Sequence, residues 1–284
     1  MSGSGKIAFQ GEPGAYSQIA CEMFAPALTP LPCGTFEAAL AAVSDGVAER
    51  AMLPIENSLA GRVADIHHLL PKAGLHIVAE HFLPIQHQLL VTPGTKAEDI
   101  KIVRSHAMAL GQCRGVIAEL GMKAEMAGDT AGAAKRLAET KAPDEAVIAS
   151  VKASEIYGLE IARANIEDAG HNTTRFLVMD QNPNDPPYDE AQDPGETMTS
   201  FVFQVRNIPS ALYKALGGFA TNGINMTKLE SYQPDGKFSA TMFYADIEGH
   251  PEDRNVRLAL EELSFFSSSL MVLGVYVSAR RRDL

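Results

Sequence analysis

Short polar segments of this sequence carry the side chains that bind and activate small anions. In Asn172-Thr173-Thr174-Arg175-Phe176 two hydroxyls stand beside an arginine, whose guanidinium can hold a carboxylate through two parallel hydrogen bonds. Threonine is a weak acid, so it could assist a reaction only through a hydrogen bond placed where charge develops. The same segment could instead be the β-branched start of a strand with a surface arginine, and its spacing alone does not decide.

A second polar segment, Pro54-Ile55-Glu56-Asn57-Ser58, follows an apolar run typical of a strand, and Gly61 and Arg62 come next. A helix cap would account for one short side chain, Asn57 or Ser58. It would leave the charged Glu56 unexplained. We therefore favour a substrate site over a capping cluster at this position.

Two further segments offer polar groups beside predicted strands. Ser105-His106 ends an apolar run, and Gln112 lies seven residues after Ser105, about two turns of a helix, so that both side chains can face the same way. Alone, Ser105 would be a helix cap and His106 a structural histidine.

Gly11-Glu12-Pro13-Gly14 lies between a strand and a helix, where backbone N–H groups can hold a carboxylate. It lacks the full Gly-x-Gly-x-x-Gly pattern and its acidic partner, so an anion contact or a tight turn is expected rather than a nucleotide cofactor.

The bulk properties limit the class of protein. The 284 residues are enough for two domains, and the formal net charge of -11 argues against a nucleic-acid partner. An anionic substrate would then need a local group of cations or helix N-termini. Cys21, Cys33 and Cys113 have no metal-type spacing and are expected to be small buried side chains. The apolar runs are too short to span a membrane and none is of signal-peptide type, which predicts a cytoplasmic protein without a membrane partner.

Strand and helix patterns alternate over the first two thirds of the chain, and these elements must position the polar groups. The predicted strands are Ile7–Phe9, Ala51–Ile55, Leu75–Val91 with an interruption at Pro84, Ile100–Arg104, Met122–Met126, Ala146–Ala149 and Phe176–Met179. The predicted helices are Ala15–Phe24, Phe36–Val43, Arg62–Leu70, His106–Leu120 and Thr130–Glu139. Such alternation predicts an α/β fold with a mostly parallel sheet covered by helices. Ligands of these sheets bind beyond the carboxyl ends of strands, which directs attention to the residues just after each strand.

The last third has a different organisation. Residues 181–196 are rich in Pro, Asn, Asp and Gly without any periodicity, which predicts a linker. A compact βαββαβ pattern follows, with a hairpin turn expected at Gln233-Pro234-Asp235-Gly236. Its strands are Thr199–Val205, Ile224–Tyr232, Phe238–Ile247 and Ser269–Ser278, and its helices are Ser210–Thr221 and Glu252–Leu263. This order predicts a ferredoxin-like domain.

Taken together, these segments strongly resemble the prephenate dehydratase family over essentially the whole chain. The segments that carry the resemblance are Phe9 to Ser17, Pro54 to Ser58 with Gly61 and Val63, Asp129-Thr130-Ala131, Ile148-Ala149-Ser150, and Asn172 with Thr174-Arg175-Phe176. The resemblance implies that Thr174 is the catalytic threonine, acting with Asn57, Gln112 and Ser105. The substrate-binding residues that it implies are Glu56, Ser58, Arg175, Gly14, Ala15 and Tyr16.

The resemblance also implies a domain organisation. Residues 1–180 are expected to form a two-lobed catalytic domain like periplasmic binding proteins, with one lobe of about 1–79 and 166–180 and the other of about 80–165. Residues 181–196 would be the linker, and residues 197–284 resemble an ACT regulatory domain. Such domains pair, so a homodimer or homotetramer is expected. The residues implied for binding the effector L-phenylalanine are Ser210, Ala211, Leu212, Asn222, Gly223, Ile224, Asn225, Glu230 and Ser231. Two positions depart from the family pattern, since Ser210 replaces a glycine and Tyr232-Gln233 replaces Arg-Pro.

The implied reaction is the decarboxylative dehydration of prephenate to phenylpyruvate in L-phenylalanine biosynthesis. Aromatisation drives it, so neither a metal nor a redox cofactor is expected. Thr174 would hydrogen-bond to the departing hydroxyl, while Arg175 and backbone N–H groups near Gly11 to Ala15 hold a carboxylate. The alternatives are arogenate dehydratase, which performs the same chemistry on the amino-acid form, and a non-enzymatic amino-acid sensor. We expect one activity only.

The alternation of side chains along a strand constrains this hypothesis. Thr173 and Thr174 would face opposite sides of a regular strand, and so would Thr174 and Arg175. If both Thr174 and Arg175 serve the substrate, the chain must bend before the regular strand that is predicted from Phe176.

Overall fold

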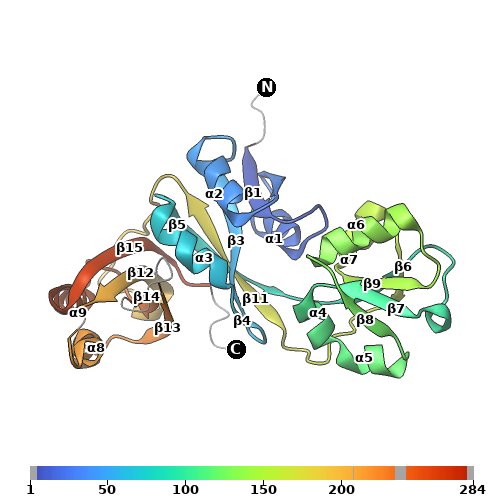
Figure 1. Cartoon of the computed structure of the whole chain (residues 1–284). Coiled ribbons are helices and arrows are strands. Elements are labelled where there is room, and N and C mark those ends of the chain that lie inside the picture. The colour runs from blue at the N-terminus through green and yellow to red at the C-terminus, as the bar shows by residue number, and fades with distance from the viewer. Residues whose placement is uncertain (1–4, 207, 234–240, 280–284) are drawn as a thin grey trace. The chain divides into compact units, whose positions relative to one another are not determined.

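The computed structural model describes residues 5–206, 208–233 and 241–279 (Figure 1). Contacts divide the chain into two compact units. The first unit comprises Met1–Ala39, Met52–Arg62 and Phe82–Phe176, and the second comprises Leu40–Ala51, Val63–His81 and Leu177–Leu284. No helix in the described ranges is long and apolar enough to cross a membrane.

The first sheet has the strand order β2-β1-β3-β11-β5, with the short strand β4 paired to β3. These strands are β1 (Lys6–Gln10), β2 (Thr29–Cys33), β3 (Arg50–Asn57), β4 (Gly61–Arg62), β5 (His76–Pro84) and β11 (Thr173–Asp180). The sequence pattern missed Thr29–Cys33, which contains two prolines. Proline cannot donate to a ladder, and it is tolerated here because β2 lies at the edge of the sheet.

The second sheet has the order β10-β6-β9-β7-β8 and lies in the first unit. Its strands are β6 (Gln88–Val91), β7 (Ile102–Ser105), β8 (Lys123–Met126), β9 (Glu145–Ala149) and β10 (Glu160–Arg163). The strand β7 is parallel to β8 and β9, whereas β6 is antiparallel to β9 and β10. The expectation of a mostly parallel sheet is therefore wrong for this mixed sheet. A helical crossover makes strands of one sheet parallel, but β6 enters this sheet directly from β5 of the first sheet, so no crossover requires it to run parallel to β9 and β10.

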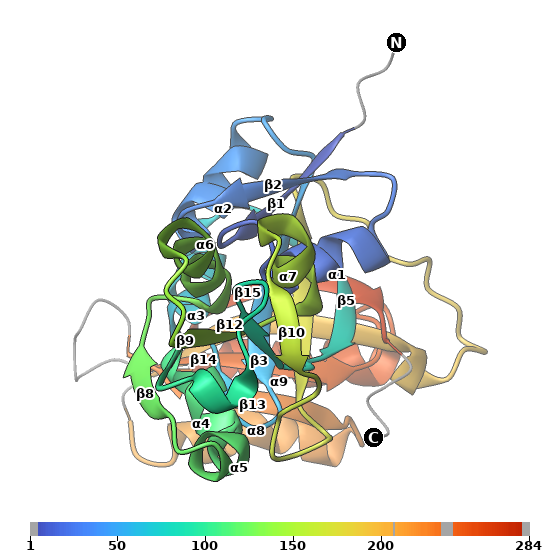
Figure 2. The ribbon, with the colours of Figure 1, turned by 90° about the vertical axis from the view of Figure 1, so that its right-hand side faces the viewer.

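Helices cover both faces of the second sheet (Figures 1 and 2). On one face, α4 (Ala107–Gln112) and α5 (Arg114–Glu119) pack on a core that includes Leu89 and Ile148. On the other face, α6 (Thr130–Thr140) and α7 (Val151–Tyr157) pack on a core that includes Leu90 and Val147. Successive residues of β6 and of β9 therefore alternate between the two cores, as the pleat of a strand requires.

The predicted helix His106–Leu120 is in fact two helices with a break at Cys113, whose backbone adopts φ -127° and ψ 31°. The second helix starts there because the Asp168 carboxylate accepts hydrogen bonds from the backbone N–H groups of Arg114 and Gly115, both at 2.9 Å. A cap supplied by a residue 54 positions away leaves no local pattern in the sequence.

The remaining helices before residue 180 are α1 (Tyr16–Phe24), α2 (Phe36–Ser44) and α3 (Ala64–Leu69), with the 3-10 turns η1 (Leu70–Lys72) and η2 (Ala97–Asp99). The predicted start of α3 at Arg62 is wrong, because Gly61 and Arg62 form β4 and pair with Asn57 and Glu56.

The C-terminal part of the second unit has the element order βαββαβ. Its elements are β12 (Thr197–Val205), α8 (Ala211–Thr221), β13 (Met226–Tyr232), β14 (Met242–Glu248), α9 (Arg254–Phe266) and β15 (Ser267–Val277). The sheet order is β13-β14-β12-β15 and all pairs are antiparallel. Phenylalanines of β12, β14 and α8 form a core between this sheet and the two helices. The expected hairpin turn at 234–236 lies outside the described residues.

The opposite face of this sheet contacts α3 and the start of β5 within the same unit. The rings of His67 and Tyr244 meet edge to face with centroids 5.2 Å apart. On β15, Gly274 lies so close to Ile77 that an added β-carbon would stand 2.1 Å from the Ile77 carbonyl oxygen. Backbone therefore packs on backbone at this position, which only glycine allows.

This contact predicts the effect of Gly274→Ala. The methyl group would force the two strands apart, and overpacking of this kind costs about 1–3 kcal/mol or more. We expect a clear fall in the midpoint of thermal unfolding, measured by scanning calorimetry. Gly128→Ala is the matched control, because a β-carbon at Gly128 meets no atom within 4 Å. Equal midpoints for the two variants would contradict the packing described here.

Candidate active site

The side chain of Asn57, at the end of β3, is fixed by its own backbone. Its Oδ1 accepts hydrogen bonds from the N–H groups of Leu59 at 3.0 Å and Ala60 at 2.9 Å. Because both backbone groups are donors, the oxygen of the amide must face them and the nitrogen must face β11. There Asn57 Nδ2 donates to Asn172 Oδ1 at 2.7 Å and to Thr174 Oγ1 at 3.0 Å.

The hydroxyl of Thr174 is polarised by this contact. Its oxygen accepts from Asn57, so its own hydrogen points away from the amide and can be donated to another molecule. Among the described residues, Asn57 is its hydrogen-bond partner. Thr174 is 9% exposed, so a bound molecule could reach it while bulk water is largely excluded. The arrangement suits the stabilisation of a departing oxygen.

The hydrogen bonds continue beyond Asn57. Gln112, the last residue of α4, accepts at Oε1 from Asn172 Nδ2 at 3.0 Å, and its Nε2 lies 3.4 Å from Asn57 Oδ1. His87 Nε2 is 2.9 Å from the same Gln112 oxygen, and His87 Nδ1 is 2.7 Å from the Tyr16 hydroxyl. The structure thus brings together three predicted residues directly, namely Thr174, Asn57 and Gln112. It links Tyr16 to them through His87.

The members of this network are uncharged at neutral pH. Burial lowers the pKa of His87 below its usual 6.5, although the hydrogen bond with Gln112 and the nearby Glu167 act in the other direction. Burial also raises the pKa of Tyr16 well above 10.0. Beside the network, burial raises the pKa of the Cys113 thiol to about 12, so this residue is not a thiolate nucleophile.

Arg175 and Glu56 lie on the other face of the first sheet and pair with each other. Arg175 Nη1 is 3.1 Å from Glu56 Oε1, and the arginine side chain is 2% exposed. The strand β11 is regular from Thr173 onward, so the chain does not bend to bring Thr174 and Arg175 to one side. This geometry does not favour the predicted role of Arg175 and Glu56 as substrate contacts.

Two predicted serines have other partners. The hydroxyl of Ser105 is fully buried and donates to the Ile148 carbonyl at 2.6 Å, so it does not join the Asn57 cluster. It is not the cap of α4 either, since His106 Nδ1 accepts from Met108 N–H. The hydroxyl of Ser58 donates to the His171 carbonyl at 2.9 Å and accepts from Thr173 N–H at 3.0 Å. The Ser105 hydroxyl thus joins β7 to β9, and the Ser58 hydroxyl joins the end of β3 to the start of β11.

Backbone N–H groups of the Gly11–Gly14 turn and of Ala15 already donate to acceptors within the protein. The N–H groups of Gly11, Gly14 and Ala15 donate to Cys33 O, Gln18 Oε1 and Glu12 O respectively. Gly14 has φ +91°, and a β-carbon there would lie 2.8 Å from Ala153 Cα. These contacts explain the glycine by close packing on α7, and they do not favour Gly14 and Ala15 as carboxylate ligands.

A cavity adjoins the cluster at Gln112. Its volume is about 330 Å³, and it is lined by Leu59, Ala107, Met108, Gly111, Gln112, Arg114, Asp168 and Ala169. Leu59 and Met108 are 40% and 43% exposed and offer apolar surface. Arg114 is the cation among these lining residues, and its guanidinium folds over Gly111. The cavity can therefore take a molecule with a ring and an acidic group.

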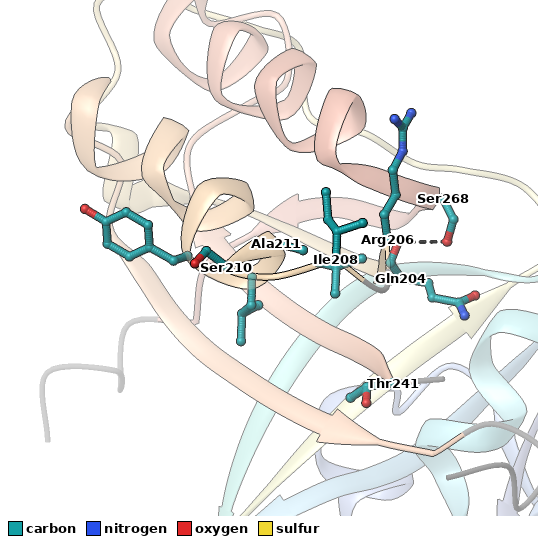
Figure 3. A pocket seen from close by; sticks show the side chains of 10 residues that line it. Gln204, Arg206, Ile208, Ser210, Ala211, Thr241 and Ser268 are labelled. Atoms are coloured by element: carbon teal, nitrogen blue, oxygen red, sulfur yellow. Dashed lines mark hydrogen bonds between the residues drawn. The ribbon is translucent and has the colours of Figure 1, made fainter. Parts of the chain in front are cut away.

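The residues predicted to bind an effector fall at two places in the second unit. Ser210, Ala211 and Leu212 line a cavity of about 400 Å³ at the start of α8, together with Arg206 and Thr241 (Figure 3). Gly223, Ile224 and Asn225 line another cavity beyond the end of α8. Asn222 caps the end of α8. Glu230 pairs with Lys228 on β13, and Ser231 follows Glu230 on the same strand. In the part of the chain that the structure describes, Ser210–Leu212 and Gly223–Asn225 line separate cavities.

Sequence reasoning missed His87 and Arg114 and gave Asn172 no role of its own. His87 is one of three consecutive polar residues, Gln86-His87-Gln88, within an apolar stretch, and that interruption was the available signal. Arg114 had no such signal, because its position depends on the helix break at Cys113.

Comparison with known proteins identifies the family. The sequence model described as prephenate dehydratase matches residues 7–184. The chain belongs to the prephenate dehydratase family. Members of this family are carbon–oxygen lyases, so the chain is an enzyme of the hydro-lyase type.

Individual relatives cover nearly the whole chain. A bifunctional N-acyl-homoserine lactone acylase/prephenate dehydratase of Komagataeibacter europaeus is 53% identical over 97% of both chains. An arogenate dehydratase/prephenate dehydratase of Arabidopsis thaliana is 40% identical over 95% of this chain and 71% of its own length. The crystal structure of prephenate dehydratase from Arthrobacter aurescens in complex with L-Phe is 30% identical, with a TM-score of 0.86 over 98% of this chain and 91% of that one. This likeness supports the expected two-lobed α/β catalytic domain.

The buried neutral imidazole predicts how stability depends on pH. Above the unfolded-state pKa of about 6.5 neither state of His87 is protonated, so the shift has no effect there. As the pH falls below that value, the unfolded chain takes up a proton before the folded chain does, and folding free energy is lost down to the lowered folded pKa. Glutamine does not titrate, so the stability of the wild type relative to His87→Gln should fall as the pH drops below about 6.5. Denaturant unfolding at several pH values measures this, and a difference independent of pH would contradict it.

Proposed function

We propose that the chain is a prephenate dehydratase in which Thr174 hydrogen-bonds to the departing ring hydroxyl. The observation that carries this proposal is the direction of one hydrogen bond. Asn57 donates to Thr174 Oγ1, so the threonine proton is presented to the substrate. A threonine whose oxygen lacked such a donor could point its hydrogen elsewhere.

The chemistry needs little more than this group and correct positioning. The bond from the ring to its carboxylate breaks and carbon dioxide leaves. The electron pair of that bond moves into the ring, and the hydroxide on the opposite carbon departs. Thr174 donates a hydrogen bond to the oxygen as negative charge develops on it, and the departing hydroxide becomes water by taking a proton from solvent. Charge that passes to Thr174 Oγ1 meets the Asn57 N–H, so the amide stabilises the same transition state.

Arg114 is the residue that we propose for holding a substrate carboxylate, in place of Arg175. It lines the cavity that reaches the cluster at Gln112, whereas Arg175 is buried in an ion pair. A local cation is needed because the net charge of the chain is -11 and the substrate is an anion. Leu59 and Met108 would contact the ring.

The direction of the Asn57 bond predicts the outcome of mutating Thr174. Thr174→Ala should lower kcat about 100- to 10,000-fold with a small change in KM, as expected for a contact made mainly in the transition state. Thr173→Ala, one residue away and on the opposite face, is the matched control and should retain near-normal kcat. Ultraviolet detection of phenylpyruvate from prephenate is the assay. A near-normal rate for Thr174→Ala would refute the assignment.

The cavity predicts a different kinetic signature for Arg114→Ala. Loss of a carboxylate contact that is present in both ground and transition states should raise KM about 10-fold or more and change kcat little. Lys123→Ala removes one positive charge from an exposed position in the same unit, and its KM should be unchanged. If both variants raise KM equally, the effect is that of net charge and Arg114 has no specific role.

The preference for prephenate over arogenate is part of the proposal. The relative in Komagataeibacter is described as a prephenate dehydratase, while the Arabidopsis relative is described by both activities. The measurement that decides is kcat/KM of the purified chain on the two substrates. A larger kcat/KM on arogenate would overturn the proposed substrate and leave the role of Thr174 intact.

We propose further that residues 197–284 form an ACT regulatory domain that binds L-phenylalanine, after a catalytic domain of about 1–180 and a linker of 181–196. The βαββαβ order supports this, as does the L-Phe complex of the Arthrobacter relative. The two groups of predicted effector residues lie at opposite ends of α8, an 11-residue helix about 16 Å long at 1.5 Å per residue. Two copies of the domain could place the start of one α8 beside the end of the other, which is the basis for proposing a homodimer or homotetramer.

This arrangement predicts that residues at both ends of α8 affect the same binding event. Leu212→Ala and Ile224→Ala should each weaken L-phenylalanine binding about fivefold or more, roughly 1 kcal/mol, as expected for lost apolar contact. Leu258→Ala, an exposed leucine of α9, should leave it unchanged. Isothermal titration calorimetry measures the affinities. Absence of L-phenylalanine binding to the wild type would remove the regulatory proposal.

A second candidate activity is hydrolysis of N-acyl-homoserine lactones. It is favoured by the 53% identity to the Komagataeibacter relative, whose description includes acylase activity. Mass spectrometry of homoserine lactone and fatty acid released by the purified chain tests it. Release by wild type and by Thr174→Ala alike would place that activity outside the cluster.

A further inference from the structure

His87 and Tyr16 extend the hydrogen-bonded cluster beyond the residues that meet the substrate in the proposed reaction. His87 is buried in the first unit, with 3% of its surface exposed, and Tyr16 beside it is partly buried. Their rings meet edge to face with centroids 5.5 Å apart. Two polar groups buried to this extent are costly unless their hydrogen bonds are all made, so their orientation should matter.

The orientation of every member of the cluster follows from the backbone next to Asn57. Asn57 Oδ1 accepts hydrogen bonds from two backbone N–H groups, so the Nδ2 of the same side chain faces Asn172 Oδ1. Asn172 must then present its nitrogen to Gln112 Oε1. The remaining neighbour of that oxygen is His87 Nε2, at 2.9 Å, and an oxygen can only accept. His87 Nε2 must therefore carry a hydrogen.

The other side of the imidazole is equally determined. In a neutral ring with hydrogen on Nε2, Nδ1 is an acceptor. The Tyr16 hydroxyl lies 2.7 Å from His87 Nδ1 and is the donor that this nitrogen needs. The Gln86 carbonyl, 2.9 Å from the same hydroxyl, is the other acceptor within reach of Tyr16. The backbone of His87 is held as well, because its N–H donates to Glu167 Oε2 and its carbonyl accepts from Ile166 N–H.

We propose that His87 is a positioning residue for Thr174: its Nε2–H fixes the Gln112 amide, and Gln112 in turn holds Asn57 and Asn172 so that the threonine proton faces the substrate. Tyr16 sets the tautomer of His87. The proposal rests on the proposed function of Thr174. It assigns Tyr16 an indirect role in place of the substrate contact expected from the sequence.

Burial favours the neutral ring that this role requires, against the effect of Gln112 and Glu167. Tyr16 of α1 and Gln112 of α4 contact its two nitrogens, and Glu167 is the charged group that faces it. Burial lowers the pKa of His87 despite that carboxylate. The ring thus keeps one donor and one acceptor at the pH at which an enzyme of this kind works.

Kinetics of two variants test the proposal. His87→Ala should lower kcat about 10- to 100-fold with KM within about threefold, since small displacements of a reacting group cost this much. His87→Gln should recover most of the rate, because its amide nitrogen can donate to Gln112 Oε1 as the imidazole does. His106→Ala is the matched control, for His106 caps α4 and has no contact with the cluster. Full activity of His87→Ala, or equal loss in His87→Gln and His87→Ala, would overturn the proposal.

The tautomer is tested without any activity measurement. Long-range proton–nitrogen correlation spectra of the folded wild type should show hydrogen on Nε2 of His87 at neutral pH. Tyr16→Phe should increase the fraction with hydrogen on Nδ1. A wild-type ring with hydrogen on Nδ1 would overturn the proposal even if His87→Ala did not fold. If the wild type failed to convert prephenate, the proposed function would fall, whereas the spectra would still decide the orientation of His87.

Discussion

Two backbone N–H groups, those of Leu59 and Ala60, determine the polarity of the candidate active site. Both donate to Asn57 Oδ1, and this forces the amide nitrogen toward β11. An asparagine side chain can otherwise present either end to a neighbour, since its two ends differ little in shape. Here the turn after β3 removes that freedom. The threonine proton, and with it the chemistry that we propose, therefore depends on the conformation of a short turn rather than on a charged residue.

The cluster is built from amides, hydroxyls and one neutral imidazole, which differs from the usual pairing of a general acid with a general base. A decarboxylation that forms an aromatic ring does not require a base, because the electron pair comes from the broken carbon–carbon bond. A carboxylate among these groups would also repel the anionic substrate. Glu56 and Arg175, the charged pair nearest to the cluster in sequence, neutralise each other on the opposite face of the sheet. Buried neutral networks are stabilising only when every group is paired, and this requirement keeps the cluster rigid.

Sequence patterns predicted the parts of this structure that depend on local order. The alternation of side chains along β11 separated Thr174 from Arg175, and the contacts agree with that separation. The resemblance identified Thr174, Asn57 and Gln112, which the structure brings together. It also suggested Ser105, whose hydroxyl is instead used inside the second sheet. What could not be predicted depends on distant partners. The Asp168 cap that starts α5 comes from far along the chain, and so does the contact that places His87 behind Gln112.

The bond from Ser58 N–H to the Thr173 carbonyl, at 2.8 Å, has a consequence for the chemical ageing of the protein. Asparagine deamidates when the nitrogen of the following residue attacks its side-chain carbonyl carbon and closes a succinimide ring. At Asn57 that nitrogen belongs to Ser58, and it is engaged in the pairing of β3 with β11. The extended backbone of β3 also holds it away from the carbonyl carbon. The residue whose conversion to aspartate would reverse the polarity of the whole cluster is thus protected from that conversion by the fold.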